Sequence, residues 1–227
     1  MSAPAGARVL VVGVGGLGCP ASLALARAGV ARLTLVDPDR VEASNLHRQL
    51  WYRGSDVGQL KVTTAAERLR AAFPAVEVAT QAVKVDASSA EALLREHDLA
   101  IDGTDGVEAK FALSDAAVRA GKTLIYGGVL RLSGQAMAIR PGGPCLRCLF
   151  DVVPSAEDAP SCAEAGVLGS MAGVIGGLQA LLALAELRGG APAGVSTLHV
   201  VEGRLLTSRQ VTVRKAADCT ACGGAAA

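Results

Sequence analysis

The sequence predicts one doubly wound α/β domain built on a mixed β-sheet. At 227 residues the chain is long enough to bury a full hydrophobic core and short enough to be a single domain. Its residues are 51% hydrophobic but only 3% aromatic, a composition that suits parallel strands covered by helices. Strand-like and helix-like stretches alternate through residues 1–127, and the pattern changes in residues 128–227. We therefore expect residues 1–227 to form one domain with two distinct halves.

The first half opens with a βαβ unit: a strand over residues 9–12, a turn over 13–18, a helix over 21–29 and a strand over 33–36. More helices are expected over residues 59–72, 88–95 and 107–121, and more strands near 76–79, 99–101 and 123–126. This alternation predicts a parallel sheet with helices on both faces.

The second half is expected to add antiparallel strands. A strand over residues 132–140 and an irregular connection over 150–167 precede a hairpin formed by residues 198–201 and 204–213, which turns at Glu202 and Gly203. Strands joined by hairpins pair antiparallel, so the sheet becomes mixed at its second end.

Charge and hydropathy exclude several classes of protein. The 22 basic residues nearly balance the 21 acidic ones and form no basic block, which argues against a nucleic-acid partner. The N-terminus, MSAPAGARVL, has no apolar run behind a charged segment, so we expect a cytoplasmic protein without a secretory signal. Residues 165–185 carry no charge and could span a bilayer by length, but they contain five glycines and a glutamine and stand alone. We predict a helix buried within the protein and no membrane partner.

A glycine turn follows the first strand. Gly13, Gly15 and Gly18 have the spacing G-x-G-x-x-G, which allows a tight turn and a close approach of backbone N–H groups to phosphate at a helix N-terminus. Asp37 ends the next strand, where its carboxylate can accept both ribose hydroxyls. The pattern predicts a Rossmann-like nucleotide site. Alone it is also typical of an NAD-linked oxidoreductase, and that alternative stays open at this point.

The polar stretch after Asp37 favours a triphosphate over NAD. Arg48 offers a planar fork and Lys61 a point charge, which together can neutralise phosphoryl oxygens and stabilise a departing pyrophosphate, while Asn45 completes the hydrogen bonding. Asp102 and Asp105 end the fourth strand at the same sheet edge, and paired carboxylates beside a triphosphate suggest a Mg²⁺ site. These residues indicate ATP chemistry.

Four of the six cysteines predict a structural zinc site. Two C-x-x-C pairs can close a tetrahedral Zn²⁺ site, and they are formed by Cys145, Cys148, Cys219 and Cys222. Two independent redox pairs are the alternative.

Several other residues have less specific patterns. Cys162 is a single cysteine ahead of a helix start near residue 166, where a thiolate could be stabilised, and Cys19 is expected to be a small packed residue. Trp51 is expected to anchor the connection before Lys61. No metal role is expected for the three isolated histidines His47, His97 and His199.

Six motifs in order resemble one family: GVGGLG, VDPDRVEASNLHRQ, GQLK, DGTDG, PCLRC and CAEAGVLG. From about Arg8 to Cys222 the chain resembles the bacterial ubiquitin-activating (E1)-like adenylyltransferases, the MoeB/ThiF/HesA group. The resemblance implies ATP-dependent adenylation of the C-terminal glycine of a small ubiquitin-like sulfur carrier that ends in Gly-Gly, with release of pyrophosphate. It also implies a homodimer, a nucleotide-binding half over residues 1–127 and a carrier-binding and zinc half over 128–227.

The same resemblance implies site residues. Arg48 and Lys61 would contact the phosphates, Asp105 would hold Mg²⁺, and Cys162 would form a covalent link to the carrier, as it does in some members but not in others. The expected nucleotide contacts are Gly13, Gly15, Gly16, Gly18, Asp37, Ser44, Asn45, Leu46, His47, Arg48, Lys61, Asp105 and Gly106.

The chain departs from the family pattern at three points. The family has an arginine in an N-terminal helix that reaches into the partner's site, and only seven residues precede Arg8 here. Gly106 stands where the family has Asn, and Lys110 where it has Arg. We expect Arg53 or a partner to supply the missing charge. A zinc-stabilised protein-binding module with weakened catalysis is the remaining alternative, and the charge balance and cysteine pairs argue against a tRNA-modifying dehydratase.

Overall fold

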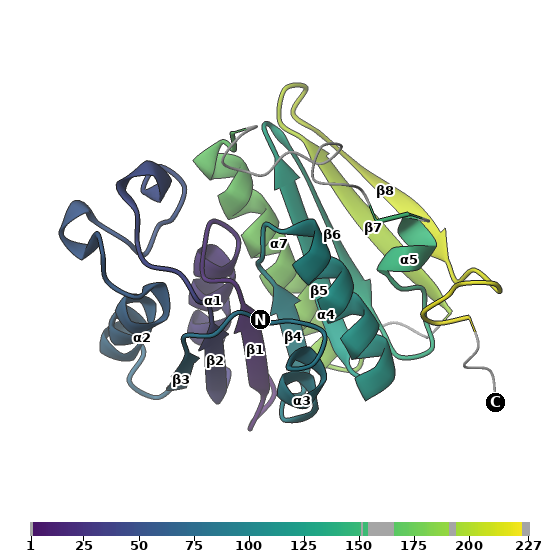
Figure 1. Ribbon diagram of the computed structural model, residues 1–227, viewed down its shortest axis with the longest axis horizontal. Helices are drawn as coiled ribbons and strands as arrows, with labels where there is room; N and C mark the ends of the chain where they lie inside the picture. Colours follow the sequence, from purple (N-terminus) through teal and green to yellow (C-terminus); the bar gives the residue numbers. More distant parts are fainter. Residues whose placement is uncertain (1, 151, 154–165, 191–193, 224–227) are drawn as a thin grey trace.

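A computed structural model describes residues 2–150, 152–153, 166–190 and 194–223. Its eight strands form one sheet in the order β3-β2-β1-β4-β5-β6-β7-β8 (Figure 1). The parallel part consists of β1 (Arg8–Val12), β2 (Arg32–Val36), β3 (Glu77–Gln81), β4 (Leu99–Asp102) and β5 (Thr123–Leu130). The antiparallel part consists of β6 (Ser133–Ile139), β7 (Val195–Glu202) and β8 (Thr207–Arg214). The predicted mixed, doubly wound sheet is confirmed.

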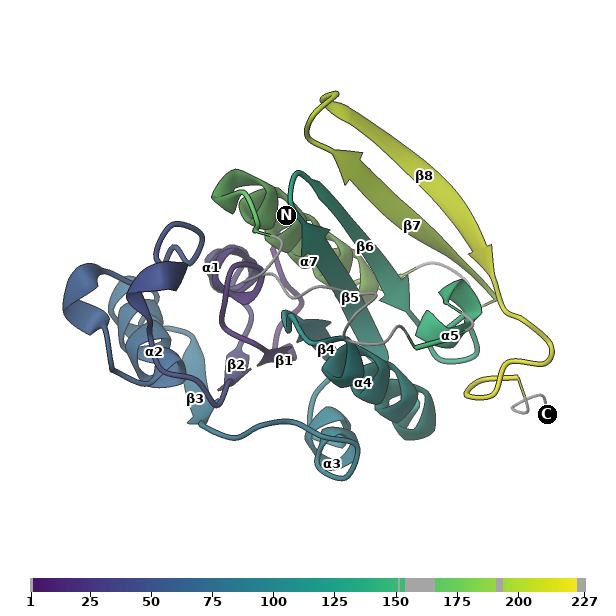
Figure 2. The ribbon, with the colours of Figure 1, turned by 45° about the horizontal axis from the view of Figure 1, so that its top comes forward.

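Helices cover both faces of the sheet (Figures 1 and 2). One core cluster joins the strands to α1 (Gly18–Arg27), α2 (Lys61–Ala72) and α7 (Gly169–Leu187). A second cluster joins the opposite face to α3 (Ala90–Arg95), α4 (Val107–Ala120) and α5 (Leu146–Leu149). Two 3₁₀ turns, η1 (Ala43–Asn45) and η2 (Gly54–Asp56), lie between β2 and α2. Most side chains of β1 and β4 are apolar and fully buried, as expected for central strands covered on both sides.

The sequence pattern gave the order of the elements but misjudged several boundaries. The helix after the glycine turn begins at Gly18, because the last glycine of the motif already belongs to its first turn. Strand β5 runs on through Gly127 and Gly128 because β6 pairs with it along that whole stretch, and β8 begins only at Thr207. Helix α5 had no prediction. Of the expected irregular connection, residues 151 and 154–165 lie outside the described residues.

Helix α7 corresponds to the long uncharged segment. Its length and composition alone would allow it to cross a membrane. One face of α7 packs against α1 and the central strands, and it includes Ile175, Gly176 and Gln179. For this face, the prediction of a helix buried within the protein is confirmed. The other face is not buried, because Val174 and Leu181 there are 50% and 56% exposed. This face therefore leaves an apolar stripe on the surface.

His97 is buried between α3 and β2, where both of its ring nitrogens have hydrogen-bond partners. Its ring nitrogens lie 2.7 Å from the carbonyl oxygen of Leu93 and 2.7 Å from the hydroxyl of Thr34. A neutral imidazole can donate to the carbonyl and accept from the hydroxyl at the same time. Burial therefore lowers the pKa of His97 from its ordinary value of 6.5, and its hydrogen bond to Leu93 only partly offsets this.

This environment predicts an acid-sensitive contribution to stability. The folded protein binds the His97 proton less readily than the unfolded chain, so the contribution is complete above pH 6.5 and is lost as pH falls through the lowered pKa. Urea denaturation of wild type and His97→Gln from pH 7.5 to 5 should show a steeper loss of unfolding free energy in wild type. Equal slopes would contradict this assignment.

Candidate active site

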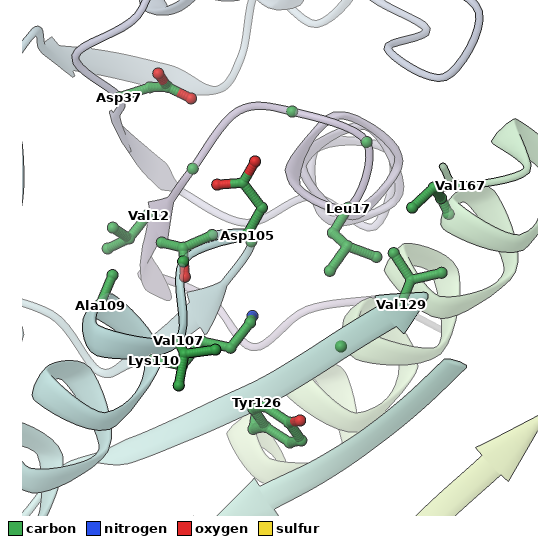
Figure 3. A pocket seen from close by; sticks show the side chains of 18 of the residues that line it. Val12, Leu17, Asp37, Asp105, Val107, Ala109, Lys110, Tyr126, Val129 and Val167 are labelled. Atoms are coloured by element: carbon green, nitrogen blue, oxygen red, sulfur yellow. The ribbon is translucent and has the colours of Figure 1, made fainter. Parts of the chain in front are cut away.

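One cavity of about 800 Å³ opens where the carboxyl ends of the parallel strands meet the antiparallel part of the sheet. Its first half is polar and is formed by the glycine turn, the ends of β2 and β4, and the start of α2. Its second half lies on β5, β6 and β7. Figure 3 shows Asp37 and Asp105 on one side of the cavity and Tyr126 on the other, with Lys110 between them. Open α/β sheets bind ligands at this edge.

The glycine turn is shaped by a close approach of main chains. Gly13 has φ +85°, and a Cβ there would lie 2.6 Å from the carbonyl carbon of Gly103, at the end of β4. A Cβ at Gly18 would collide with the carbonyl oxygen of Gly13. Only glycine fits at these positions, because any side chain would push β1, β4 and α1 apart. The turn therefore brings its backbone to the wall of the cavity.

Asp37 holds the turn from the end of β2. The backbone N–H of Val14 donates to one carboxylate oxygen at 2.7 Å, and that of Asp39 donates to the other at 2.9 Å. Burial raises the pKa of Asp37, while the positive charge of Lys61 and the two N–H donors act in the opposite direction. A carboxylate fixed on two sides and facing the cavity is well placed to accept further hydroxyl donors.

Two buried cations line the polar half. Lys61 begins α2, its side chain is 6% exposed, and its ammonium lies 2.8 Å from Asp39. Burial acts to lower the pKa of Lys61, but the charges of Asp37, Asp39 and Asp105 outweigh it and the pKa rises, so the group stays charged. Arg48 is also buried, and its guanidinium donates to the side-chain oxygen of Asn45 at 2.6 Å.

The two carboxylates at the end of β4 have different environments. Asp102 is fully buried, accepts from the backbone and hydroxyl of Thr104, and lies 3.0 Å from the ammonium of Lys110. Its carboxylate is therefore committed to the protein, and the expectation that both carboxylates would be open to Mg²⁺ was wrong. Asp105 lines the cavity and is the one of the two that can meet a ligand.

The other predicted nucleotide contacts lie in different places. Gly15, Gly16 and Gly106 line the cavity, and Gly18 packs beneath the turn. The four residues before Arg48 do not line it: Ser44, Asn45, Leu46 and His47. Asn45 and His47 instead contact the Arg48 guanidinium.

The residue proposed to supply an extra charge lies outside the cavity. Arg53 is exposed, precedes η2 as its N-cap and donates its backbone N–H to Asp56, and it does not line the cavity. Cys162 lies outside the described residues.

Sequence reasoning missed the second half of the cavity. Tyr126 and Gly128 from β5, Gln135 from β6, Val200 from β7 and Phe150 after α5 all line it. The pair Gly127-Gly128 inside an apolar strand was the available signal, because glycine within a strand often marks the close approach of a ligand or another backbone.

The four predicted zinc ligands come together. The sulfur atoms of Cys145, Cys148, Cys219 and Cys222 all lie within 4.8 Å of one another, with Cys145 and Cys219 3.5 Å apart and Cys148 and Cys222 3.4 Å apart. A tetrahedral zinc site with bonds of about 2.3 Å separates its sulfurs by about 3.8 Å, so this donor set fits Zn²⁺. The alternative of two independent redox pairs was wrong, because each C-x-x-C contacts the other.

The predictions for Cys19 and Trp51 are confirmed. Cys19 is buried and its thiol donates to the carbonyl oxygen of Val14 at 3.3 Å, and burial raises its pKa to about 12. Trp51 donates from its indole to the carbonyl oxygen of Cys19 at 3.0 Å, so it anchors its connection to α1.

A sequence model described as the ThiF family matches residues 5–221. The chain belongs to the ThiF family. This agrees with the resemblance of its six motifs, and it disfavours an NAD-linked oxidoreductase, whose glycine turn would look the same.

Two relatives within the ThiF family are about equally similar. The chain is 40% identical over 223 residues to a sulfur carrier protein adenylyltransferase from Thermus thermophilus, covering 96% of this chain and 82% of that protein. It is 41% identical over 218 residues to adenylyltransferase and sulfurtransferase MOCS3 from Culex quinquefasciatus, covering 95% of this chain but 50% of that protein. The chain thus spans only half of the Culex protein.

Solved structures share the ThiF fold at lower identity. The crystal structure of E. coli MccB with ATP matches with a TM-score of 0.84 and 20% identity, covering 96% of this chain and 67% of that one. MccB with MccA-N7isoASN matches equally well, with a TM-score of 0.84 and 20% identity over the same shares. At this identity the likeness establishes the fold alone.

Proposed function

We propose that the chain uses ATP to adenylate the C-terminal glycine of a ubiquitin-like sulfur carrier and releases pyrophosphate. The observation that supports this most strongly is that one cavity is lined by the glycine turn together with four charged residues: Asp37, Arg48, Lys61 and Asp105. The name of the Thermus relative, at 40% identity, supports the same substrate class.

The residues account for the reaction by alignment and charge. A carboxylate oxygen of the carrier attacks the α-phosphorus, the bond from this phosphorus to the bridging oxygen breaks, and pyrophosphate leaves with the electron pair. The attacking carboxylate is already ionised, so no general base is needed. Asp37 holds the ribose, and Lys61 and Arg48 neutralise charge that develops on the phosphoryl oxygens.

Asp105 is the proposed Mg²⁺ ligand. A magnesium ion commonly binds one or two protein carboxylates together with substrate phosphates, and a single carboxylate in the cavity fits this habit. When bound, Mg²⁺ supplies further neutralisation of the phosphates.

Pyrophosphate exchange into ATP tests the proposal directly. With a recombinant ubiquitin-like carrier ending in Gly-Gly, wild type should catalyse exchange, and Lys61→Ala and Asp105→Ala should each lower the rate by about 10²–10³. Glu67→Ala, an exposed change on the same helix as Lys61, serves as the matched control and should stay within about twofold. Exchange that survives in both variants would refute these roles, and tight carrier binding without exchange would favour the protein-binding module.

We also propose that the four cysteines hold one Zn²⁺ ion with a structural role. Between its two C-x-x-C pairs, such a site joins α5 to the segment after β8. Helix α5 is in turn tied to α4, because Arg147 pairs with Asp115 at 2.8 Å and the backbone of Leu146 donates to Ser114 at 3.1 Å.

Metal analysis of purified, reduced protein should find about one zinc per chain, and chelation should lower the thermal midpoint. Cys222→Ser should lose the metal, whereas Cys19→Ala should keep it, because the Cys19 thiol contacts Val14 and lies outside the cluster. Zinc-free wild type with an unchanged midpoint would exclude the site.

A homodimer is proposed through the exposed face of α7. Val174 and Leu181 are half exposed there, Gly173 and Gly177 face open space, and a groove separates this face from β7 and β8. A second copy related by twofold symmetry would cover the same stripe with its own.

Sedimentation velocity tests this contact. Wild type should sediment as a dimer, and Leu181→Glu should shift it toward monomer because a charge would be buried in the contact. Leu205→Glu is the matched control, since Leu205 is 69% exposed in the β7–β8 turn and does not line the groove beside α7. A monomeric wild type, or an unchanged Leu181→Glu dimer, would contradict the proposed surface.

A further inference from the structure

The second half of the cavity contains a buried phenol that the adenylation chemistry does not use. Tyr126 is 5% exposed, lines the cavity from β5, and shares its face of the sheet with Gly128 and, on β6, Gln135. The surrounding cavity residues include Val200 and Phe150, so the environment is mainly apolar. A polar group in such a place normally has a partner or a purpose.

Tyr126 and Gln135 form one hydrogen-bonded pair. The side-chain amide of Gln135 donates to the Tyr126 hydroxyl oxygen at 2.7 Å. Among the residues that the structure describes, no acceptor is found for the proton of the hydroxyl itself. Burial raises the pKa of Tyr126, so the phenol keeps that proton at neutral pH and remains a donor.

The pair of Tyr126 and Gln135 offers a donor in either orientation of the Gln135 amide. If its nitrogen donates to Tyr126, the phenol proton remains for another acceptor. If the amide is turned over, its oxygen accepts the phenol proton and its NH₂ group becomes the donor. In both arrangements the pair offers at least one N–H or O–H donor at the wall of the cavity.

Gly128 keeps this donor accessible. A Cβ at position 128 would lie 2.9 Å from the Tyr126 oxygen, closer than real Cβ atoms come, so any side chain there would press on the hydroxyl. The absence of a side chain leaves room over the strand for an extended peptide backbone.

Backbone groups in this region already have partners, so they are less available to an incoming peptide than the side chains of Tyr126 and Gln135 are. The carbonyl oxygen of Gly127 accepts from Lys110 at 2.6 Å. Just after β5, the backbone groups of Arg131 are paired with Gly166 and Leu168. A peptide lying here would therefore find its donor in the Tyr126 and Gln135 side chains.

We propose that Tyr126 and Gln135 donate a hydrogen bond to a main-chain carbonyl of the carrier's C-terminal Gly-Gly segment and so position its carboxylate for attack on ATP. This inference rests on the proposed adenylation of such a carrier. Lys110, which lines the cavity between Tyr126 and Asp105, marks where the peptide would meet the nucleotide half. Tyr126 is a positioning residue, because its contact is with the tail and not with the reacting phosphorus.

The test is the split of kinetic constants in pyrophosphate exchange. Tyr126→Phe removes the hydroxyl alone and should raise KM for a Gly-Gly-ended ubiquitin-like carrier about three- to tenfold, while KM for ATP stays within about twofold. Gln135→Leu should act in the same direction. The double variant should be no worse than the more damaged single variant, since both changes break one interaction.

Tyr52→Phe is the matched control for loss of a buried tyrosine hydroxyl. Its hydroxyl donates to the carbonyl oxygen of Val14 at 2.7 Å behind the glycine turn, so any loss should fall on ATP binding or stability and leave the carrier KM unchanged. The thermal midpoint of each variant shows whether it is folded.

The outcomes separate this inference from the proposed function. An unchanged carrier KM in folded, active Tyr126→Phe would overturn the role of the pair and leave adenylation intact. Equal rises in both KM values would also overturn it, because they would indicate a general structural effect. Absence of exchange in wild type would instead count against the proposed function itself, and the inference would fall with it.

Discussion

The contact of bare backbone between Gly13 and Gly103 is the constraint on which the rest of the site depends. It lets β1, β4 and the start of α1 converge, with Gly18 packed on the carbonyl of Gly13. Asp37 then fixes the turn by accepting the N–H of Val14. A side chain at any of the three glycines would push these elements apart. The hydrogen bond from Val14 to Asp37 would then be stretched and the polar wall of the cavity displaced. The charged residues can act on one ligand only because this backbone packing holds their supports together.

The cavity joins two parts of the sheet with different physical tasks. The parallel part supplies fixed charges, and ion pairs such as Lys61 with Asp39 and Lys110 with Asp102 keep buried cations in place before any ligand arrives. The strands from β5 to β7 supply a mainly apolar surface with glycines and one polar pair, which suits an extended chain of small residues. Meeting at one edge, the two parts can hold a polyphosphate and an acyl group in line, and such alignment is a large share of catalysis in transfer reactions without acid–base steps.

The sequence predicted what depends on local pattern and missed what depends on tertiary contact. The glycine turn, Asp37 and the four cysteines were found because their spacing has a direct geometric meaning. The separate environments of Asp102 and Asp105 were not, since only the folded chain brings Lys110 and Thr104 to Asp102. Ser44 and His47 lie in the motif but not on the cavity wall. Tyr126 and Gln135 carry no motif, and strand register alone brings them together.

Equilibrium binding of nucleotides by calorimetry tests the central claim most directly, namely that buried charges around the glycine turn exist to hold three linked phosphates. Wild type should bind ATP at least about tenfold more tightly than AMP, a difference of about 1.4 kcal/mol, and the difference should shrink as salt rises. NAD⁺ should bind no better than AMP. Equal affinity for AMP and ATP, or preferred binding of NAD⁺, would contradict the account.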